Sequence, residues 1–157
     1  MAAITIIPFR DDLAAAFARL NQAWIERFFR LEPSDLNTLR DPQGSVLAGG
    51  GQIFFALDGD EPVGAVAAVR VSPGVYELAK MAVSPSHQGR GIGEMLGHAA
   101  IDYALAQRAE VMFLETNSAL GPAIRLYERL GFAHAQRPTP SVYERADVYM
   151  ELRFDRS

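Results

Sequence analysis

Gln88-Gly89-Arg90-Gly91-Ile92-Gly93 is the stretch of this sequence that decides the fold. It follows an apolar run at 75–83 and precedes a helical pattern at 92–108, so it connects a predicted strand to a predicted helix. Its three glycines let backbone N–H groups turn toward a ligand without interference from a Cβ atom. A helix that begins there adds the positive end of its dipole. The stretch is therefore a candidate phosphate-binding loop.

The spacing of the glycines argues against two other kinds of phosphate loop. No glycine lies three residues after Gly93, as a dinucleotide-binding fingerprint requires, and no Gly-Lys-Ser/Thr follows, as a Walker loop requires. A glycine-rich loop that only caps the helix remains as the alternative.

Outward from this loop, apolar periodicity predicts a mixed sheet with helices. Strands are expected at 3–9, 52–57, 62–71, 75–83, 111–116, 132–135 and 146–154, and helices at 13–31, 33–40, 92–108 and 121–130. The stretch 44–51 is expected to be a loop. Antiparallel hairpins are combined with one βαβ crossover from 75–83 to 111–116, which indicates an α/β or mixed α+β fold.

Composition limits the classes of protein that remain. The 157 residues are 49% hydrophobic and 22% charged, so we expect one ordinary globular domain spanning 1–157. There is no cysteine, which excludes disulfides, thiolate metal sites and a cysteine acyl-enzyme.

A net charge of −4 argues against nucleic acid as a partner. No apolar run approaches the ~20 residues of a membrane span, and the expected location is cytoplasmic. His87, His98 and His134 lack metal-ligand spacing, so no metal site is predicted.

The sequence resembles the GNAT superfamily of N-acetyltransferases at three places. Its loop meets the coenzyme pattern Gln/Arg-x-x-Gly-x-Gly/Ala through Gln88, Gly91 and Gly93. The resemblance extends upstream through 77–83 and downstream from Asn117 to 126–132. It covers nearly the whole chain, although 1–51 matches only in outline. It implies a mostly antiparallel mixed sheet flanked by helices, in which two central strands splay apart.

The resemblance also implies acetyl-CoA as the acyl donor and indicates which residues bind it. The pantetheine arm would enter between the splayed strands, and the backbone N–H of Met81 would hold the acetyl carbonyl oxygen. The residues expected to bind the coenzyme are Met81, Ala82, Val83, Gln88, Gly89, Arg90, Gly91, Ile92, Gly93, Glu94, Asn117 and Ala123.

Glu77 and Tyr127 are the catalytic candidates under this resemblance. Glu77 precedes Gln88 by 11 residues, a separation similar to that of family members in which a strand glutamate acts as the base through water. Tyr127 corresponds to a tyrosine whose hydroxyl reaches the coenzyme sulfur. A solvated or arginine-paired Glu77 and a Tyr127 that only packs are the alternative interpretations.

The acceptor is expected to be an amine, and the sequence does not identify it. Trp24, Phe28 and Phe29 are expected to be helix core, or else to wall the acceptor pocket together with Tyr143, Arg145 and Asp147. Lys80 is expected on the opposite strand face from Glu77, as a partner for a carboxylate. The expected reaction is direct attack by a primary amine on the thioester in a ternary complex. A non-catalytic acyl-CoA-binding module remains the alternative function, and a homodimer is compatible with both.

Overall fold

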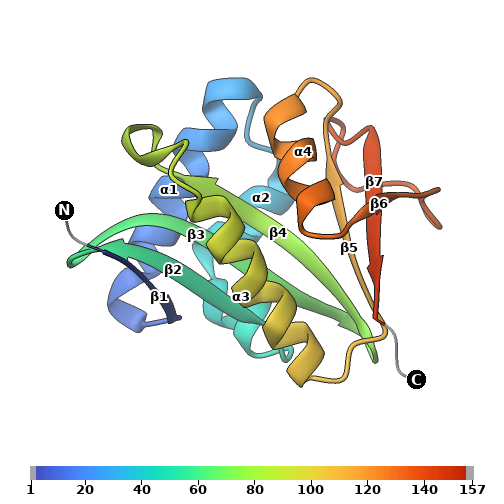
Figure 1. The fold of residues 1–157 in the computed structure, drawn as a ribbon, viewed down its shortest axis with the longest axis horizontal. Coiled ribbons are helices and arrows are strands. Elements are labelled where there is room, and N and C mark those ends of the chain that lie inside the picture. The colour runs from blue at the N-terminus through green and yellow to red at the C-terminus, as the bar shows by residue number, and fades with distance from the viewer. Residues whose placement is uncertain (1–2, 155–157) are drawn as a thin grey trace.

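A seven-stranded mixed sheet is the framework of the molecule in the computed structural model, which describes residues 3–154 (Figure 1). The strand order is β1-β2-β3-β4-β5-β7-β6. The strands are β1 Ile4–Pro8, β2 Gln52–Asp58, β3 Glu61–Ser72, β4 Val75–Val83, β5 Val111–Thr116, β6 Ala133–His134 and β7 Val148–Arg153. All neighbouring strands are antiparallel except β4 and β5, which are parallel and joined by the predicted crossover. The mixed, mostly antiparallel fold is therefore confirmed.

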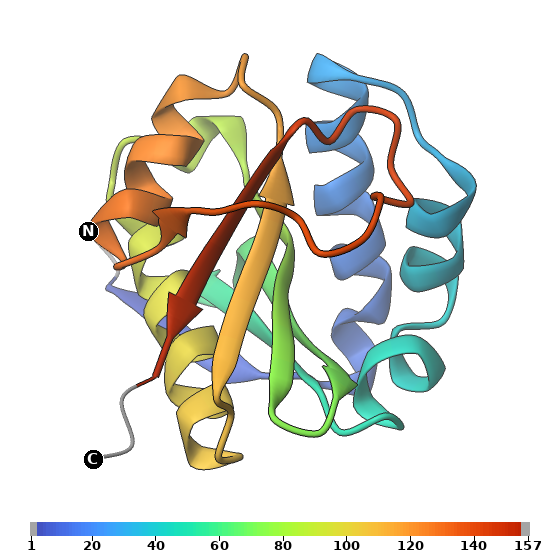
Figure 2. The ribbon, with the colours of Figure 1, turned by 90° about the vertical axis from the view of Figure 1, so that its right-hand side faces the viewer.

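Two pairs of helices cover the two faces of the sheet, which Figure 2 shows lying between them. The helices are α1 Ala14–Phe28 and α2 Pro33–Arg40 on one face, and α3 Ile92–Ala106 and α4 Gly121–Arg129 on the other. Each face has its own apolar core. Phe17 and Phe55 are fully buried in the core on the α1 side, and Leu96 and Met150 in the core on the α3 side. Strands with apolar side chains on both faces therefore lie at the centre.

Strands β4 and β5 part soon after they pair. Their ladder ends where Glu77 meets Phe113, although β4 remains paired with β3 as far as Val83, and β5 with β7 as far as Thr116. The carboxyl-terminal halves of two central strands therefore face each other across an opening. The splayed strands that the resemblance implied are confirmed.

A β-bulge at Lys80 changes the direction of the side chains along β4. The β3 register passes from Ala65 opposite Ala82 to Ala67 opposite Ala79, so β4 contains one extra residue here. Lys80 has φ of 54°, in the left-handed region that non-glycine residues rarely adopt. Lys80 consequently lines the same pocket as Glu77. The expectation that these two side chains lie on opposite faces was wrong, because it assumed an unbroken two-residue alternation.

Other differences from the expected elements are local. The stretch expected to be a loop at 44–51 overlaps a single π-helical turn, Gln43–Leu47. The strand expected at 132–135 is reduced to β6, and residues 135–147 form a long connection to β7. Helix α4 ends before Gly131, whose φ of 107° is that of a glycine after a helix C-terminus. No helix within residues 3–154 is both long enough and apolar enough to span a bilayer.

Candidate active site

Two cavities meet where β4 and β5 part. The larger is a cleft of about 470 Å³ between the start of α3, α4 and the end of β4. The smaller is a pocket of about 90 Å³ enclosed by α1, β4, β5 and the 135–147 segment. Both are lined by the same four residues, Trp24, Met81, Leu120 and Tyr127. These residues form the junction between the two cavities.

The larger cleft contains most of the residues predicted to bind the coenzyme. Its lining includes Met81, Ala82, Val83, Gln88, Gly89, Gly91, Ile92, Gly93, Glu94 and Ala123. Arg90 belongs to the same loop but does not line the cleft, and Asn117 lines the smaller pocket instead. Among the residues missed by sequence reasoning are Leu120, Leu126 and Arg129. They lie in or before a helix whose apolar spacing indicated packing rather than binding.

The loop that opens this cleft has the backbone that its glycines allow. Gly89 and Gly91 have φ of 78° and 77°, and a Cβ atom on either would meet no atom within 4 Å. Glycine is therefore required here by backbone conformation rather than by crowding. Gly91 is the N-cap of α3, and no side chain caps this helix start. The helix N-terminus is thus open to an anionic group.

Side-chain hydrogen bonds connect this loop to neighbouring strands. His87 lies 2.8 Å from Asp58 at the end of β2 and 2.8 Å from the hydroxyl of Ser86. The side-chain amide of Gln88 donates to the carbonyl of Val83, 3.3 Å away. These contacts tie the loop to the ends of two strands, which positions it beside the opening between β4 and β5.

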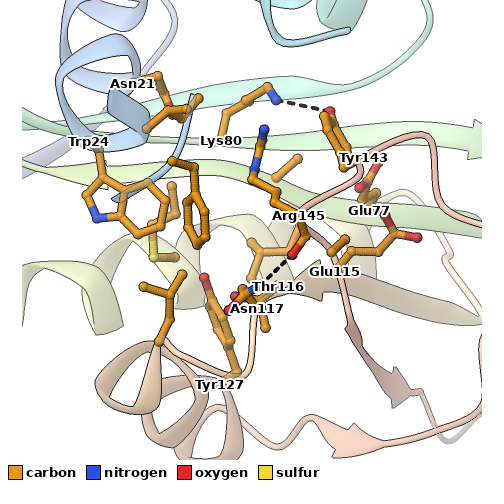
Figure 3. A pocket seen from close by; sticks show the side chains of 17 residues that line it. Asn21, Trp24, Glu77, Lys80, Glu115, Thr116, Asn117, Tyr127, Tyr143 and Arg145 are labelled. Carbon is orange, nitrogen blue, oxygen red and sulfur yellow. Dashed lines mark hydrogen bonds between the residues drawn. The ribbon is translucent and has the colours of Figure 1, made fainter. Parts of the chain in front are cut away.

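The smaller pocket combines aromatic walls with charged side chains, as Figure 3 shows. Trp24 and Phe29 line it from α1 and the residue after it, and Tyr143 lines it from the 135–147 segment. Glu77 and Lys80 come from β4, and Glu115 comes from β5.

Glu77 is an acidic group with an unusual environment. Burial, and after it the nearby Glu115, raises the pKa of its carboxyl, while Lys80 lowers it, and the net result is a pKa of about 7. Glu115 is itself held by the guanidinium of Arg137 at 3.1 Å and the hydroxyl of Ser141 at 2.5 Å. Glu77 makes no side-chain hydrogen bond within residues 3–154. A carboxyl with a pKa near neutrality can both accept and release a proton at physiological pH.

Tyr127 lies at the junction of the two cavities. Its ring packs edge to face against Phe132, with 6.4 Å between ring centroids. Burial raises the pKa of its hydroxyl to about 12, so the hydroxyl stays protonated throughout the neutral range. In the described part of the chain this hydroxyl has no hydrogen-bond partner. It is therefore a free donor facing the place where the cavities join.

The side chain of Asn117 makes two hydrogen bonds within the protein. Its amide nitrogen donates to the carbonyl of Arg145 at 2.6 Å, and its oxygen accepts from the N–H of Ala119 at 2.8 Å. The side chain therefore holds the end of β5 to the 135–147 segment.

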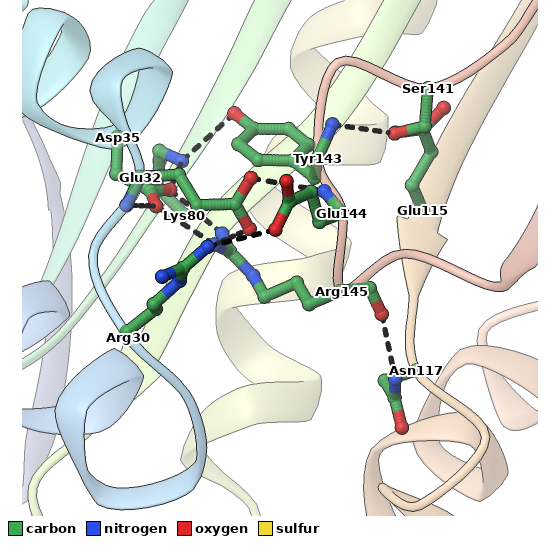
Figure 4. Close-up of polar contacts among 10 residues, drawn as sticks. All are labelled: Arg30, Glu32, Asp35, Lys80, Glu115, Asn117, Ser141, Tyr143, Glu144 and Arg145. Atoms are coloured by element: carbon green, nitrogen blue, oxygen red, sulfur yellow. Dashed lines mark hydrogen bonds and ion pairs between the residues drawn. The ribbon is translucent and has the colours of Figure 1, made fainter.

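A buried ionic cluster closes the far side of the smaller pocket (Figure 4). Asp35 of α2 has no exposed side-chain surface; it accepts from Lys80 at 2.6 Å and from both terminal nitrogens of Arg145 at 2.7 and 2.8 Å. Arg145 also donates to Glu32 at 3.0 Å, and the phenol of Tyr143 lies 3.0 Å from Lys80. We call Glu32, Asp35, Lys80, Tyr143 and Arg145 the ionic lock. It joins α2, β4 and the 135–147 segment.

The residues that were expected either in the helix core or in the wall of the acceptor pocket lie in different places. Tyr143 and Arg145 line the pocket, whereas Asp147 does not and instead accepts from the backbone N–H and hydroxyl of Ser118, both at 2.8 Å. Phe28 is 44% exposed and lines the larger cleft, so its assignment to the core was wrong. Among residues 3–154, no three His, Cys, Asp or Glu side chains are grouped as a metal site would require.

Comparison with known proteins identifies the family of the chain. A family model for the Acetyltransferase (GNAT) family matches residues 14–132. The chain therefore belongs to the GNAT family.

Named relatives match only in part. Streptothricin acetyltransferase of Streptomyces lavendulae is 37% identical over 82 residues, which cover 51% of this chain and 43% of that protein. Mycothiol acetyltransferase of a Nocardioides species is 32% identical over 116 residues, or 67% of this chain and 38% of that protein. The chain thus spans less than half the length of these relatives.

Solved structures match over nearly the full length. An acetyltransferase of the GNAT family from Staphylococcus aureus has a TM-score of 0.87 at 20% identity, covering 96% of this chain and 99% of that one. A Salmonella typhimurium protein solved with its cofactor acetyl-CoA has a TM-score of 0.79 at 21% identity, covering 99% and 96%. At this identity the likeness shows a common fold.

Replacing Asp35 by Asn tests the ionic lock. Asp35→Asn leaves Lys80 and Arg145 without their shared counter-charge, and we expect a loss of about 3–5 kcal/mol, or a fall in Tm of roughly 10 °C. Asp12→Asn is the matched control, because Asp12 is 67% exposed in its pair with Arg10. Thermal unfolding at pH 7 measures both, and an equal Tm for wild type and Asp35→Asn would contradict the role of the lock.

The same variant has a defined pH dependence. The contacts with Arg145 and Lys80 outweigh burial and lower the pKa of Asp35 from 3.8 to about 2. Its stabilising contribution is therefore complete above the unfolded-state pKa and is lost as pH falls from about 4 to 2. The Tm difference between wild type and Asp35→Asn should shrink across that window.

Proposed function

We propose that this protein transfers an acetyl group from acetyl-CoA to a primary amine by direct attack in a ternary complex, and that residues 1–157 act as one domain. Residues 1–2 and 155–157 lie outside the described part. The observation that carries the proposal is that a cleft beside a phosphate-binding type of loop meets an acidic pocket at Tyr127 and Met81.

The larger cleft offers groups suited to each part of the coenzyme. The open N-terminus of α3 and the backbone of 88–94 would bind the pyrophosphate, and the gap beyond the β4–β5 ladder would admit the pantetheine arm. The thioester would then reach the junction of the cavities. There the backbone N–H of Met81 would donate to the acetyl carbonyl oxygen and stabilise the negative charge that forms on it during attack.

Glu77 acts as the base in this proposal. An alkylammonium ion has a pKa of ~10.4, so it must lose a proton before it attacks. That proton passes to ionised Glu77, directly or through a water molecule, and then to solvent. The neutral nitrogen attacks the carbonyl carbon, and a C–N bond forms as the carbonyl oxygen becomes anionic.

Tyr127 acts as the acid when the tetrahedral intermediate collapses. The C–S bond breaks, and the departing thiolate takes the hydroxyl proton of Tyr127, so that free coenzyme thiol leaves. The second proton on the new amide nitrogen restores the phenol. One ammonium ion and one acetyl-CoA thus give one N-acetyl amine, one free thiol and one proton, which is released to solvent through Glu77.

An acyl-CoA-binding module without transfer is the second candidate. Such a module would need the larger cleft and the glycine loop. It would not need a carboxyl with a pKa of about 7, as Glu77 has, or a free phenol, as Tyr127 has. The presence of Glu77 in the smaller pocket, and of Tyr127 where that pocket meets the cleft, supports the enzyme over the module.

Gly91→Ala tests coenzyme binding. A Cβ atom at φ of 77° adds backbone strain and occupies the loop that would face the pyrophosphate, so acetyl-CoA should bind at least tenfold more weakly. Gly74→Ala, at the same φ of 77° in the β3–β4 turn, is the matched control with strain but no contact with the cleft. Gly93 is unsuitable, because its Cβ atom would lie 3.0 Å from Leu126. Equal calorimetric affinities in both variants would mean that the loop only caps α3.

Glu77→Gln tests the base through the pH dependence of kcat/KM. Because Glu77 must be ionised to accept a proton, wild-type activity should fall as pH drops through about 7. Glu77→Gln should abolish this fall on the acidic limb of the pH profile, and it should lower kcat by roughly 10²–10⁴ while coenzyme affinity stays unchanged. Glu115→Gln removes a neighbouring negative charge, so the limb should persist and move to lower pH. Profiles that coincide for wild type and Glu77→Gln would make Glu77 structural.

Tyr127→Phe tests the acid, since it removes one oxygen and keeps the ring against Phe132. We expect kcat to fall by roughly 10²–10⁴ while Tm and the Kd for acetyl-CoA change little. A thioester with a better leaving thiol should recover part of the loss. A stable variant with wild-type turnover would show that the hydroxyl is not the acid.

A further inference from the structure

The cations that line the smaller pocket are already neutralised by the protein. The Lys80 side chain is 6% exposed, and its ammonium contacts Asp35. The Arg145 side chain is 19% exposed, and its guanidinium contacts both Asp35 and Glu32. Both cations also lie over the ring of Tyr143, at 4.7 Å and 4.6 Å from its centroid. Neither is presented to the pocket as a free partner for an anion.

The carboxylates that line the pocket are not neutralised to the same extent. Glu115 is matched by Arg137 at 3.1 Å. Glu77 has no ion-pair partner within residues 3–154. Lys80 acts on Glu77 only at a distance, and its short contact is with Asp35. Glu77 is therefore the acidic group that has no ion-pair partner among the described residues around the pocket.

The remaining walls are apolar and leave little room. Trp24, Ile25, Phe29 and Leu120 surround a volume of about 90 Å³. An alkyl chain of a few methylenes fits such a space, and aromatic rings beside it also favour a cationic head group. A carboxylate there would lie near Glu77 and Glu115 with no unpaired cation to accept it, at a cost in binding.

We propose that the pocket selects slender aliphatic primary amines with no carboxylate within a few bonds of the amine, and that the ionic lock sets this preference by occupying Lys80 and Arg145. The inference rests on the proposed function, because it assigns the smaller pocket to the acceptor. It makes Glu32 a positioning residue, which affects specificity by holding Arg145 rather than by contact with the acceptor.

A size-matched pair of acceptors tests the preference on the wild-type protein. 4-Aminobutanamide and 4-aminobutanoate differ at one end in charge and hardly in shape. With acetyl-CoA, we expect kcat/KM for the amide to exceed that for the acid by at least tenfold, measured by release of free thiol. Turnover of both at equal kcat/KM would overturn the inference and leave the proposed function intact.

A pair of variants tests the role of the lock. Glu32→Gln keeps an oxygen to accept from the N–H of Glu144, but it removes one of the two carboxylates on Arg145. The preference for the amide should shrink severalfold. Glu144→Gln makes the same change of charge at a side chain that is 80% exposed and does not line the pocket, so it should leave the ratio unchanged. Equal ratios in both variants, with Tm confirming that each is folded, would overturn the role assigned to the lock.

A binding measurement separates failure of this inference from failure of the proposed function. If no thiol is released with either compound, the protein saturated with coenzyme A is titrated with each by calorimetry. Tighter binding of the amide would support the inference while the proposed transfer fails. Equal binding, or no binding, would overturn the inference as well.

Discussion

The early end of the β4–β5 ladder is the constraint on which the rest of the site depends. Backbone N–H and C=O groups in the middle of a sheet require partners, and beyond Glu77 the two strands do not supply them to each other. The sheet stays continuous because β4 remains paired with β3 and β5 with β7. The opening is therefore a stable feature rather than a frayed edge, and both cavities form around it.

The ionic lock stabilises the far side of this opening at considerable electrostatic cost. Removing Asp35, Lys80 and Arg145 from water carries a desolvation penalty, and only short, multiple contacts repay it. Asp35 meets that requirement with three charge-assisted hydrogen bonds of 2.6 to 2.8 Å. One of these contacts anchors the side chain of Lys80, whose left-handed backbone is a conformation that costs about 1–3 kcal/mol in a non-glycine residue. The bulge that results leaves Met81 at the junction of the cavities.

Local sequence patterns predicted the fold because each depends on neighbouring residues. Strand alternation, helix periodicity and the glycines of 88–93 gave the elements and their order, and the resemblance added the splayed strands. A carboxylate partner for Lys80 was predicted and is confirmed, but the rest of the lock could not be predicted in this way, because Asp35 and Arg145 are 110 residues apart and no local pattern relates them. The resemblance predicted Asn117 as a coenzyme-binding residue, and that stays a prediction; the contacts of its amide with the backbone at Arg145 and Ala119 could not be read from the sequence. Lys80 was placed on the wrong face because a single inserted residue inverts the alternation.

The lock also bears on the chemistry proposed for Glu77, through the balance of three effects on its pKa. Burial and Glu115 favour the neutral acid, while Lys80 favours the carboxylate. A Lys80 free to pair directly with Glu77 would lower that pKa toward the ordinary range of a paired glutamate and make it a weaker base. Asp35 instead holds Lys80 at 2.6 Å, so the ammonium acts on Glu77 only from a distance. In this proposal a structural ion pair keeps the pKa of the Glu77 carboxyl close to 7, where a general base is most effective at physiological pH. The stability of the lock and the basicity of Glu77 are therefore two consequences of one contact.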